Sequence, residues 1–314
     1  MSAPLWLAAA DQYALATIGE CADALAVALL AASAAPQLPA DPPRQGLSAT
    51  SGQLLVMPST MTGNIGVKLV TVADPDVQTG GPRIQGVHVQ FDSATLAPRA
   101  ILDGIALTNT RTAAVSVLAL RYLADPRSRE LLVFGAGPQA ASHIRGIVAE
   151  WPVERVRVVS RRPDSARQLI DGPLAALSGI DIAGLAPDEV AAGVGAADII
   201  VCATTSAAPV FDAMPTDRAA IVAVGSHSPA ARELPGPLVG RAYVVVEERG
   251  TALREAGDIV LSIADGVMTE HDIDAELGEL VRGAIVDRDR PRVFKSVGMA
   301  WQDAVVADAI LARS

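Results

Sequence analysis

Short, continuously apolar segments alternate with amphipathic ones from residue 130 onwards, and this alternation predicts much of the fold. Runs such as 131–134 and 199–202 contain no polar side chain apart from one cysteine, so both faces of each strand must be covered. Such strands, separated by helices, are typical of a parallel sheet with helices on both sides. We predict strands of this sheet at 131–134, 154–159, 180–182, 198–205, 220–224 and 243–246.

The first third of the chain has a different pattern, with segments rich in β-branched residues bounded by Gly, Pro, Asp or Asn. We predict strands there at 53–57, 66–72, 84–91 and 97–102. Helical spacing predicts helices at 22–35, 104–124 and about 297–312. Thr108 is the expected cap of the second of these helices.

A glycine-rich turn follows the apolar run 131–134 and opens a predicted helix. It consists of Gly135, Ala136, Gly137, Pro138, Gln139 and Ala140. This G-x-G-x-x-A order lets the backbone approach a pyrophosphate at a helix N-terminus, where free N–H groups favour anions. The pattern also occurs in purely structural turns, but its place between a strand and a helix favours a dinucleotide-binding unit.

The strand predicted at 154–159 ends in Ser160, Arg161 and Arg162. A site that prefers NAD(H) has an acidic residue here, about 20 residues past the glycines, to bind the ribose 2′-hydroxyl. A hydroxyl and two guanidinium groups suit a 2′-phosphate instead. We therefore expect NADP(H) to be preferred and NAD(H) to be possible; two solvated arginines opening a helix are the alternative.

Other cofactor contacts are expected where parallel strands end, because ligands of such sheets lie beyond the carboxyl ends of the strands. The candidates are Ala203, Thr204, Thr205, Val224, Gly225, Ser226 and Ser296, together with Thr112 in the helix before the glycine turn.

Composition narrows the class of protein. A net charge of −10 argues against nucleic acid or an anionic membrane as a partner. Cys21 and Cys202 stand alone, so neither a metal site nor a disulfide is indicated. The chain starts without a basic leader region, and the apolar stretch 22–35 contains Asp23 and is too short for a bilayer. We expect a cytoplasmic protein of two domains.

Two cations in the first third stand in unusual places. Lys68 lies among apolar residues of a predicted strand, and Arg111 lies early in a predicted helix, whose N-terminus is itself electropositive. Both positions favour an anion-binding role. The alternatives are a surface lysine at a strand end and an arginine paired with a carboxylate elsewhere in the chain.

The ordered motifs resemble the ornithine cyclodeaminase/μ-crystallin family over nearly the whole chain. The motifs are Met-Pro at 57–58, Gly-Val-Lys at 66–68, Leu-Thr at 107–108, Arg-Thr-Ala-Ala at 111–114, the glycine turn, Ala-Val-Gly-Ser at 223–226, Arg-Glu-Leu at 232–234, Gly-Asp-Ile at 257–259 and Val-Phe-Lys-Ser-Val-Gly-Met-Ala at 293–300. The resemblance implies an α/β fold in which a Rossmann domain (116–295) is inserted into a split α+β domain (1–115 plus 296–314). That split domain would bind substrate and form a homodimer.

The resemblance also implies a site. Residues matching Arg44, Lys68 and Arg111 hold the substrate carboxylate in the family, although Arg44 by itself also fits an ordinary loop. The C-terminal half is most similar to the μ-crystallin branch, whose members reduce ketimines with NADPH. We therefore expect hydride transfer to a C=N bond beside a carboxylate, or its reverse, with Lys68 and Arg111 as catalytic residues.

Alternatives remain. Leu55 and His227 replace the two carboxylates of the cyclodeaminases, so a lyase acting on ornithine ranks second. A protein that binds NADPH and a ligand without catalysis ranks third.

Met57, Phe294 and Leu55 suggest an apolar wall for the substrate, and Ser226 is a further candidate contact. His227 is expected to be a loop residue beside the cofactor, with an acid role as the alternative, and His88 and His143 to be structural or surface groups.

Overall fold

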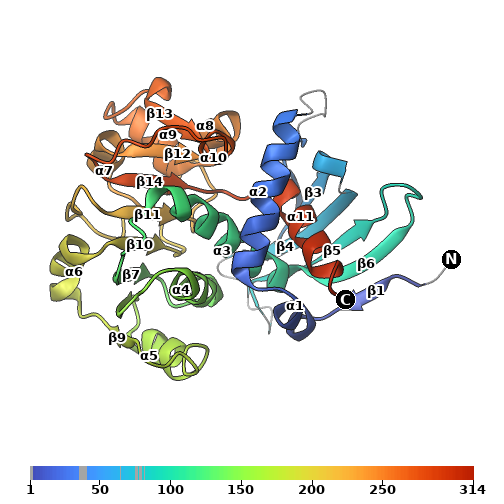
Figure 1. Cartoon of the computed structure of the whole chain (residues 1–314), viewed down its shortest axis with the longest axis horizontal. Coiled ribbons are helices and arrows are strands. Elements are labelled where there is room, and N and C mark those ends of the chain that lie inside the picture. Colours follow the sequence, from blue (N-terminus) through green and yellow to red (C-terminus); the bar gives the residue numbers. More distant parts are fainter. Residues whose placement is uncertain (1–2, 35–40, 64, 75–76, 78–79, 81) are drawn as a thin grey trace. The chain divides into compact units, whose positions relative to one another are not determined.

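The computed structural model describes residues 3–34, 41–63, 65–74, 77, 80 and 82–314. The chain divides into two compact units, of which unit 1 comprises residues 1–115 and 299–314 and unit 2 comprises residues 116–298. The division falls inside helix α3 (Gly104–Leu123), so both units contain part of this helix. Figure 1 labels the helices and strands of both units.

Unit 1 contains a six-stranded sheet in the order β1-β6-β5-β4-β3-β2. All neighbours are antiparallel except β1 and β6. The strands are β1 (Leu5–Leu7), β2 (Gln45–Ala49), β3 (Gly52–Ser59), β4 (Ile65–Ala73), β5 (Ile84–Phe91) and β6 (Pro98–Asp103). The four strands predicted from β-branched residues are present. β1 was not predicted because it has only three residues, and β2 because Leu47 is its only large apolar residue.

Helices cover one face of this sheet. They are α1 (Ala9–Leu15), α2 (Ile18–Ala34) and α11 (Ala300–Leu311), with a 3-10 turn at Met61–Gly63. α11 packs against β3, β4, β5 and α2, and most of its residues are buried, including the polar Gln302 and Asp303. The side chains of Met57, Lys68 and His88 lie in register on the buried face of three neighbouring strands.

Unit 2 contains an eight-stranded, fully parallel sheet in the order β13-β12-β14-β11-β10-β7-β8-β9. The strands are β7 (Glu130–Phe134), β8 (Arg155–Val159), β9 (Asp181–Gly184), β10 (Ile199–Cys202), β11 (Ala220–Ala223), β12 (Tyr243–Val246), β13 (Ile273–Glu276) and β14 (Arg292–Lys295). From β9 to β14 the order is that of a dinucleotide-binding Rossmann sheet, with β12 and β13 added at one edge. The α/β prediction is confirmed, and the additional strands β13 and β14 were missed.

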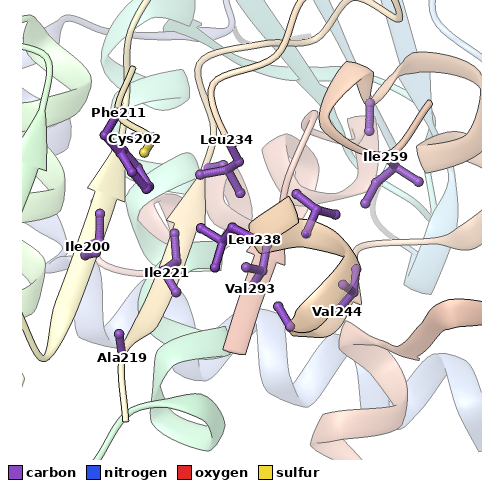
Figure 2. Packing of buried hydrophobic residues seen from close by; sticks show 14 of the residues in the cluster. Ile200, Cys202, Phe211, Ala219, Ile221, Leu234, Leu238, Val244, Ile259 and Val293 are labelled. Carbon is purple, nitrogen blue, oxygen red and sulfur yellow. The ribbon is translucent and has the colours of Figure 1, made fainter. Parts of the chain in front are cut away.

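The helices of unit 2 follow its strands. They are α4 (Pro138–Glu150), α5 (Pro163–Asp171), α6 (Val190–Ala196), α7 (Gly236–Arg241), α8 (Arg249–Glu255), α9 (Gly257–Ala264) and α10 (Leu277–Val281). Figure 2 shows part of the core on one face of the sheet, where Ile221 and Val293 meet Leu238. The rings of Phe134 and Phe211 stack there with centroids 5.0 Å apart.

Residues 296–298 belong to unit 2 rather than to the C-terminal part of unit 1. The carboxylate of Glu247 explains this, because it accepts hydrogen bonds from Ser296 Oγ and from the backbone N–H groups of Val297 and Gly298. In this division unit 2 therefore extends to Gly298.

The first two helices bear on a possible membrane segment. Within the described part of the chain, no single helix is long and apolar enough to cross a membrane. Helices α1 and α2 pass the length and composition test only as a pair, with a bend of 76° between them.

Candidate active site

A pocket of about 480 Å³ lies at the carboxyl ends of the central strands of unit 2. It is lined by loops that follow β7, β8 and β10. Nine predicted cofactor residues line it, namely Gly135, Ala136, Gly137, Ser160, Arg161, Arg162, Ala203, Thr204 and Thr205. The structure thus brings together three segments that are far apart in the sequence.

The glycine turn shapes one wall of this pocket. Gly135 has a φ of +115°, and a Cβ atom there would lie 2.3 Å from the carbonyl oxygen of Ala203. Gly137 caps α4, with Pro138 as its first residue, and a Cβ at Gly137 would meet nothing within 4 Å. The helix N-terminus therefore faces open space, which fits a pyrophosphate.

The last two residues of the turn, Gln139 and Ala140, lie in the first turn of α4. Ala140 is fully buried, and the backbone oxygen of Gln139 lies 2.8 Å from Nδ1 of His143. The other ring nitrogen of His143 lies 2.9 Å from Ser116 Oγ, and burial lowers the pKa of His143 to about 4. His143 is therefore a neutral structural group.

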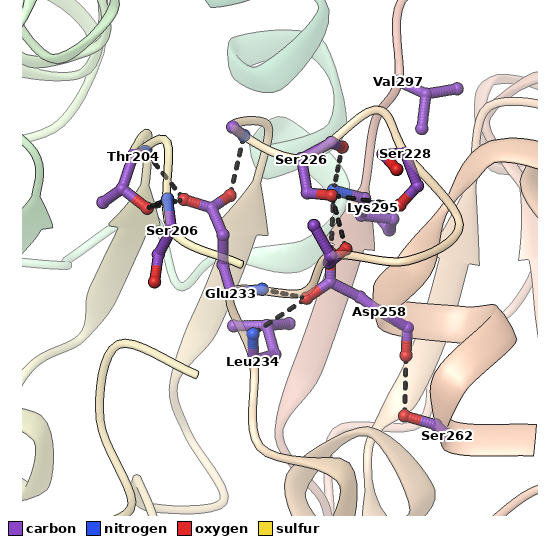
Figure 3. A network of polar contacts seen from close by, with 12 residues as sticks. Thr204, Ser206, Ser226, Ser228, Glu233, Leu234, Asp258, Ser262, Lys295 and Val297 are labelled. Atoms are coloured by element: carbon purple, nitrogen blue, oxygen red, sulfur yellow. Dashed lines mark hydrogen bonds and ion pairs between the residues drawn. The ribbon is translucent and has the colours of Figure 1, made fainter. Parts of the chain in front are cut away.

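A buried polar network holds the loops after β10 and β11 (Figure 3). Glu233 accepts hydrogen bonds of 2.7 Å from the backbone N–H and the hydroxyl of Thr204, and one of 2.7 Å from Gly225 N. Asp258 accepts from the backbone N–H groups of Glu233 and Leu234 at 2.7 and 2.8 Å. Burial raises the pKa of Glu233, although the nearby Lys295 and the Thr204 hydrogen bonds oppose the shift.

Lys295 completes this network. Its ammonium lies 2.9 Å from Asp258 Oδ2 and donates a hydrogen bond of 2.7 Å to the carbonyl oxygen of Ser226. The donors of Thr204 and Gly225 are thus committed to Glu233 rather than directed at a ligand. No role was predicted for Glu233, Asp258 or Lys295, although each lies in a motif that carried the family resemblance.

Four other predicted residues have a clear place in unit 2. The hydroxyl of Ser226 donates within its own loop to Ala231 O and Ser228 O, and that of Ser296 donates to Glu247 at 2.9 Å. Val224, partly buried, directly follows β11. Phe294 is fully buried in β14, in register with its neighbours in β11 and β12, which is the position of a core residue rather than of a pocket wall.

Unit 1 holds a buried cluster of charged side chains from three elements. Lys68 in β4 and Arg111 in α3 both contact Asp303 in α11. Lys68 Nζ lies 2.7 Å from Asp303 Oδ2, and Arg111 Nε donates a hydrogen bond of 3.1 Å to Asp303 Oδ1. The exposed fractions of the side chains are 3% for Lys68, 7% for Arg111 and 0% for Asp303. The structure thus brings Lys68 and Arg111 together on one carboxylate, and Asp303 is the partner that the alternative interpretation of Arg111 required.

Neighbouring groups complete this cluster. Gln302 Oε1 accepts from Arg111 Nη1 at 3.1 Å, and Lys68 Nζ donates to Thr108 Oγ1 at 3.4 Å. Met57 pairs with Lys68 in the sheet and is buried. The positive charge of Arg44 also helps to lower the pKa of Lys68. Thr112 follows Arg111 in α3 and is buried.

The start of α3 corrects two details of the sequence analysis. Asp103, and not Thr108, caps this helix, because its Oδ1 accepts from the backbone N–H groups of Ile105 and Ala106 at 2.9 and 2.8 Å. The Thr108 hydroxyl instead donates to Gly104 O. Arg111 therefore lies beyond the first turn, where the helix dipole has little effect, and Asp303 rather than the dipole accounts for its place.

Burial and charge set the protonation of this cluster. Burial and the charge of Arg111 lower the pKa of Lys68 to about 8, while Asp303 opposes this shift. Burial by itself would raise the pKa of Asp303, but Lys68 and Arg111 outweigh it and hold the pKa below its ordinary value. Burial lowers the pKa of His88, whose Nε2 lies 2.7 Å from Gln90 Oε1. At neutral pH the cluster thus holds two cations, one carboxylate and a neutral histidine.

Comparison with known proteins identifies the family. The model of the ornithine cyclodeaminase/mu-crystallin family matches residues 6–314. The chain belongs to this family. A Delta(1)-pyrroline-2-carboxylate reductase of Paracoccus denitrificans is 37% identical over 250 residues, 78% of each chain. The ketimine reductase mu-crystallin of Mus musculus is 34% identical over 266 residues, 82% of this chain and 80% of that protein.

A solved structure of the family covers both units. It is the Thermococcus litoralis Delta(1)-pyrroline-2-carboxylate reductase in complex with NADH and L-proline. It is 28% identical, has a TM-score of 0.89, and the alignment covers 98% of this chain and 97% of that one. The predicted family and the predicted NAD(P)-type cofactor are thereby confirmed.

Proposed function

We propose that this protein is an NAD(P)H-dependent reductase of imino acids, which converts the C=N bond beside a carboxylate into the amine of an amino acid. The buried Lys68–Asp303–Arg111 cluster is the observation that carries this proposal. Its two cations and single carboxylate leave one positive charge in a largely dry place, which is what one substrate carboxylate balances. The family membership and the relatives named as reductases of such substrates support it.

Arg111 is suited to bind the carboxylate. Its Nε and Nη1 are held by Asp303 and Gln302, and no hydrogen bond engages Nη2 among the residues that the structure describes. A guanidinium fixed on one side and open on the other forms charge-assisted, directional hydrogen bonds with a carboxylate. Arg44 adds positive charge near Lys68.

Lys68 is suited to handle the proton of the reaction. A pKa of about 8 keeps its side chain an ammonium at neutral pH yet close to the range where proton transfer is efficient. A protonated imine is the better electrophile, so a donor beside the nitrogen favours the reaction. Reduction adds one hydride to carbon and one proton to nitrogen, and the reverse oxidation removes both.

The glycine turn, the end of β8 and the loop after β10 would hold the nucleotide, which supplies the hydride when bound. On the protein side, Gly137 leaves the N-terminus of α4 open to a pyrophosphate. The Glu233 network fixes the loops at the carboxyl ends of β10 and β11. Leu55 and Met57, on the buried face that carries Lys68, favour a substrate with an apolar body.

Reduction of pyrroline-2-carboxylate and piperideine-2-carboxylate tests the function. We expect both acids to oxidise NADPH or NADH, followed as loss of the absorbance of the reduced nucleotide. Pyrroline without its carboxyl group is the control and should react at least about a hundredfold more slowly, because it loses the contacts to the cations. Ammonia release from ornithine without net nucleotide change would indicate a cyclodeaminase instead. Tight NADPH binding without either reaction would indicate a non-catalytic binding protein.

We also propose that NADP(H) is preferred over NAD(H). Arg161 and Arg162 are exposed in the pocket wall, and neither forms an ion pair with a described residue. Replacing both with alanine should raise the KM for NADPH about tenfold or more, because charge-assisted hydrogen bonds are lost. The KM for NADH should change less than about threefold. Arg167→Ala, an exposed arginine of α5 outside the pocket, is the control, and equal changes for both nucleotides would refute the preference.

The homodimer also remains our proposal. Unit 1 exposes several large apolar side chains, which are Leu5, Trp6, Tyr13, Val27, Leu30, Leu47 and Ile84. Exposed apolar surface of this kind supports association, and sedimentation equilibrium checks it.

A further inference from the structure

Asp303 is the one charged group of this cluster that contacts both cations. It is fully buried, and each of its carboxylate oxygens faces a different cation. Oδ2 lies 2.7 Å from Lys68 Nζ, and Oδ1 accepts a hydrogen bond of 3.1 Å from Arg111 Nε. The carboxylate therefore fixes the separation of the two groups expected to bind the substrate.

Helix α11 places this carboxylate. Asp303 lies in the first turn of the helix, where the partial positive charge of the N-terminus favours a carboxylate. The preceding residue, Gln302, accepts hydrogen bonds of 3.1 Å from both Arg111 Nη1 and the backbone N–H of Met299. Two consecutive residues of one helix thus hold the guanidinium in a single orientation.

We propose that Asp303 is a positioning residue of the active site, which keeps Lys68 an ammonium and Arg111 an oriented fork, so that the pair binds the substrate carboxylate. Asp303 acts through these two side chains and does not touch the reacting atoms. This role rests on the proposed imino-acid reduction. It deepens that function, because it explains how two cations remain close together in a buried place before substrate arrives.

The charges around Lys68 give the proposal a measurable consequence. Three charged groups act on Lys68, namely Arg111 from α3, Arg44 from the segment before β2 and Asp303 from α11. His88 from β5 is also close, and burial keeps its imidazole neutral. Asp303 is the negative charge that opposes the lowering of the Lys68 pKa. Without that charge the pKa of Lys68 falls further below its ordinary value, so the ammonium is lost at lower pH.

The test is the pH dependence of carboxylate binding in Asp303→Asn. The probe is pyrrole-2-carboxylate, a planar analogue of a cyclic imino acid, titrated by calorimetry into protein saturated with NADH. In the wild type, affinity should fall as the pH rises through the pKa of Lys68. In Asp303→Asn we expect this fall to begin at least about one pH unit lower. The alkaline limb of kcat/KM should move in the same direction.

A matched control lies on the same helix. Asp308 pairs with Arg99, and both side chains are partly exposed. Asp308→Asn should leave the binding profile within about 0.3 pH units of the wild type, because Asp308 is not among the charges that shift the pKa of Lys68. A merely structural role for Asp303 would lower the melting temperature or the affinity evenly at all pH values without moving the limb.

The outcomes separate this proposal from the proposed function. A wild type that binds the probe but oxidises no nucleotide with imino acids would overturn the function, whereas the binding profiles would still decide the role of Asp303. An unmoved limb in Asp303→Asn, or a wild type that does not bind the probe, would overturn that role. If Asp303→Asn does not fold, Asp303→Glu is the test variant. Its carboxylate should leave the alkaline limb at the wild-type pH, but its longer side chain should lower the affinity for the probe about tenfold. Wild-type affinity in Asp303→Glu would contradict the positioning role.

Discussion

Arg111→Ala is expected to lower kcat/KM for an imino acid by roughly a hundredfold to ten-thousandfold, because two or more charge-assisted hydrogen bonds of about 1.5–3 kcal/mol each are lost. The affinity for NADH should stay within about twofold, because Arg111 is not among the residues that line the nucleotide pocket. Steady-state kinetics measure the first effect, and fluorescence titration with NADH measures the second.

Two further variants separate chemistry from folding. Removing Arg111 leaves the buried Asp303 with Lys68 as its remaining ion-pair partner among the described residues. Part of the loss in Arg111→Ala therefore comes from lower stability. Arg111→Lys keeps the charge but loses the planar fork and should still lose at least about tenfold in kcat/KM. Arg99→Ala, which removes a partly exposed arginine paired with Asp308, should change kcat/KM less than about twofold. Retention of activity in Arg111→Ala would remove Arg111 from the substrate site.

The sequence was most informative where local pattern decides structure. The central strands of unit 2 are continuously apolar because helices and neighbouring strands cover them, and they were predicted close to their observed bounds. The glycine turn was predicted for the same reason, since a strand, a φ of +115° at Gly135 and a helix N-terminus are all local features. β13 and β14 were missed because two of the four residues in each are charged and interrupt the apolar pattern.

The sequence did not predict which residues far apart in the chain form hydrogen bonds or ion pairs with one another. Arg111 and Asp303 are separated by 192 positions, and Asp303 occurs in a segment that was interpreted only through its apolar spacing. Likewise, Thr204 and Ser296 were expected at the cofactor because they follow or end strands. The direction in which a hydroxyl donates depends on its partner in the fold. The Thr204 hydroxyl donates to Glu233, and the Ser296 hydroxyl donates to Glu247. Position along the chain predicted where these residues lie, but not what their polar atoms bind.

The two glycines of the turn should respond in opposite ways to the same small change. A Cβ at Gly135 would lie 2.3 Å from the backbone oxygen of Ala203, at a φ that favours glycine. Ala203 cannot move away easily, because its N–H donates to Phe134 O at 2.8 Å. Gly135→Ala should therefore cost about 3 kcal/mol or more and lower the melting temperature of the protein without nucleotide by at least about 5 °C.

Gly137→Ala is the matched variant. Its φ is −94°, which any residue adopts, and its Cβ would meet no atom within 4 Å. The melting temperature should stay within about 2 °C of the wild type. The new methyl group stands, however, at the N-terminus of α4, where a pyrophosphate needs close approach to the backbone, so the affinity for NADH should fall about tenfold or more. Thermal melting without nucleotide and fluorescence titration with NADH measure the two effects. Wild-type NADH affinity in Gly137→Ala would show that the pyrophosphate does not bind at this helix, even if Gly135→Ala is destabilised as expected.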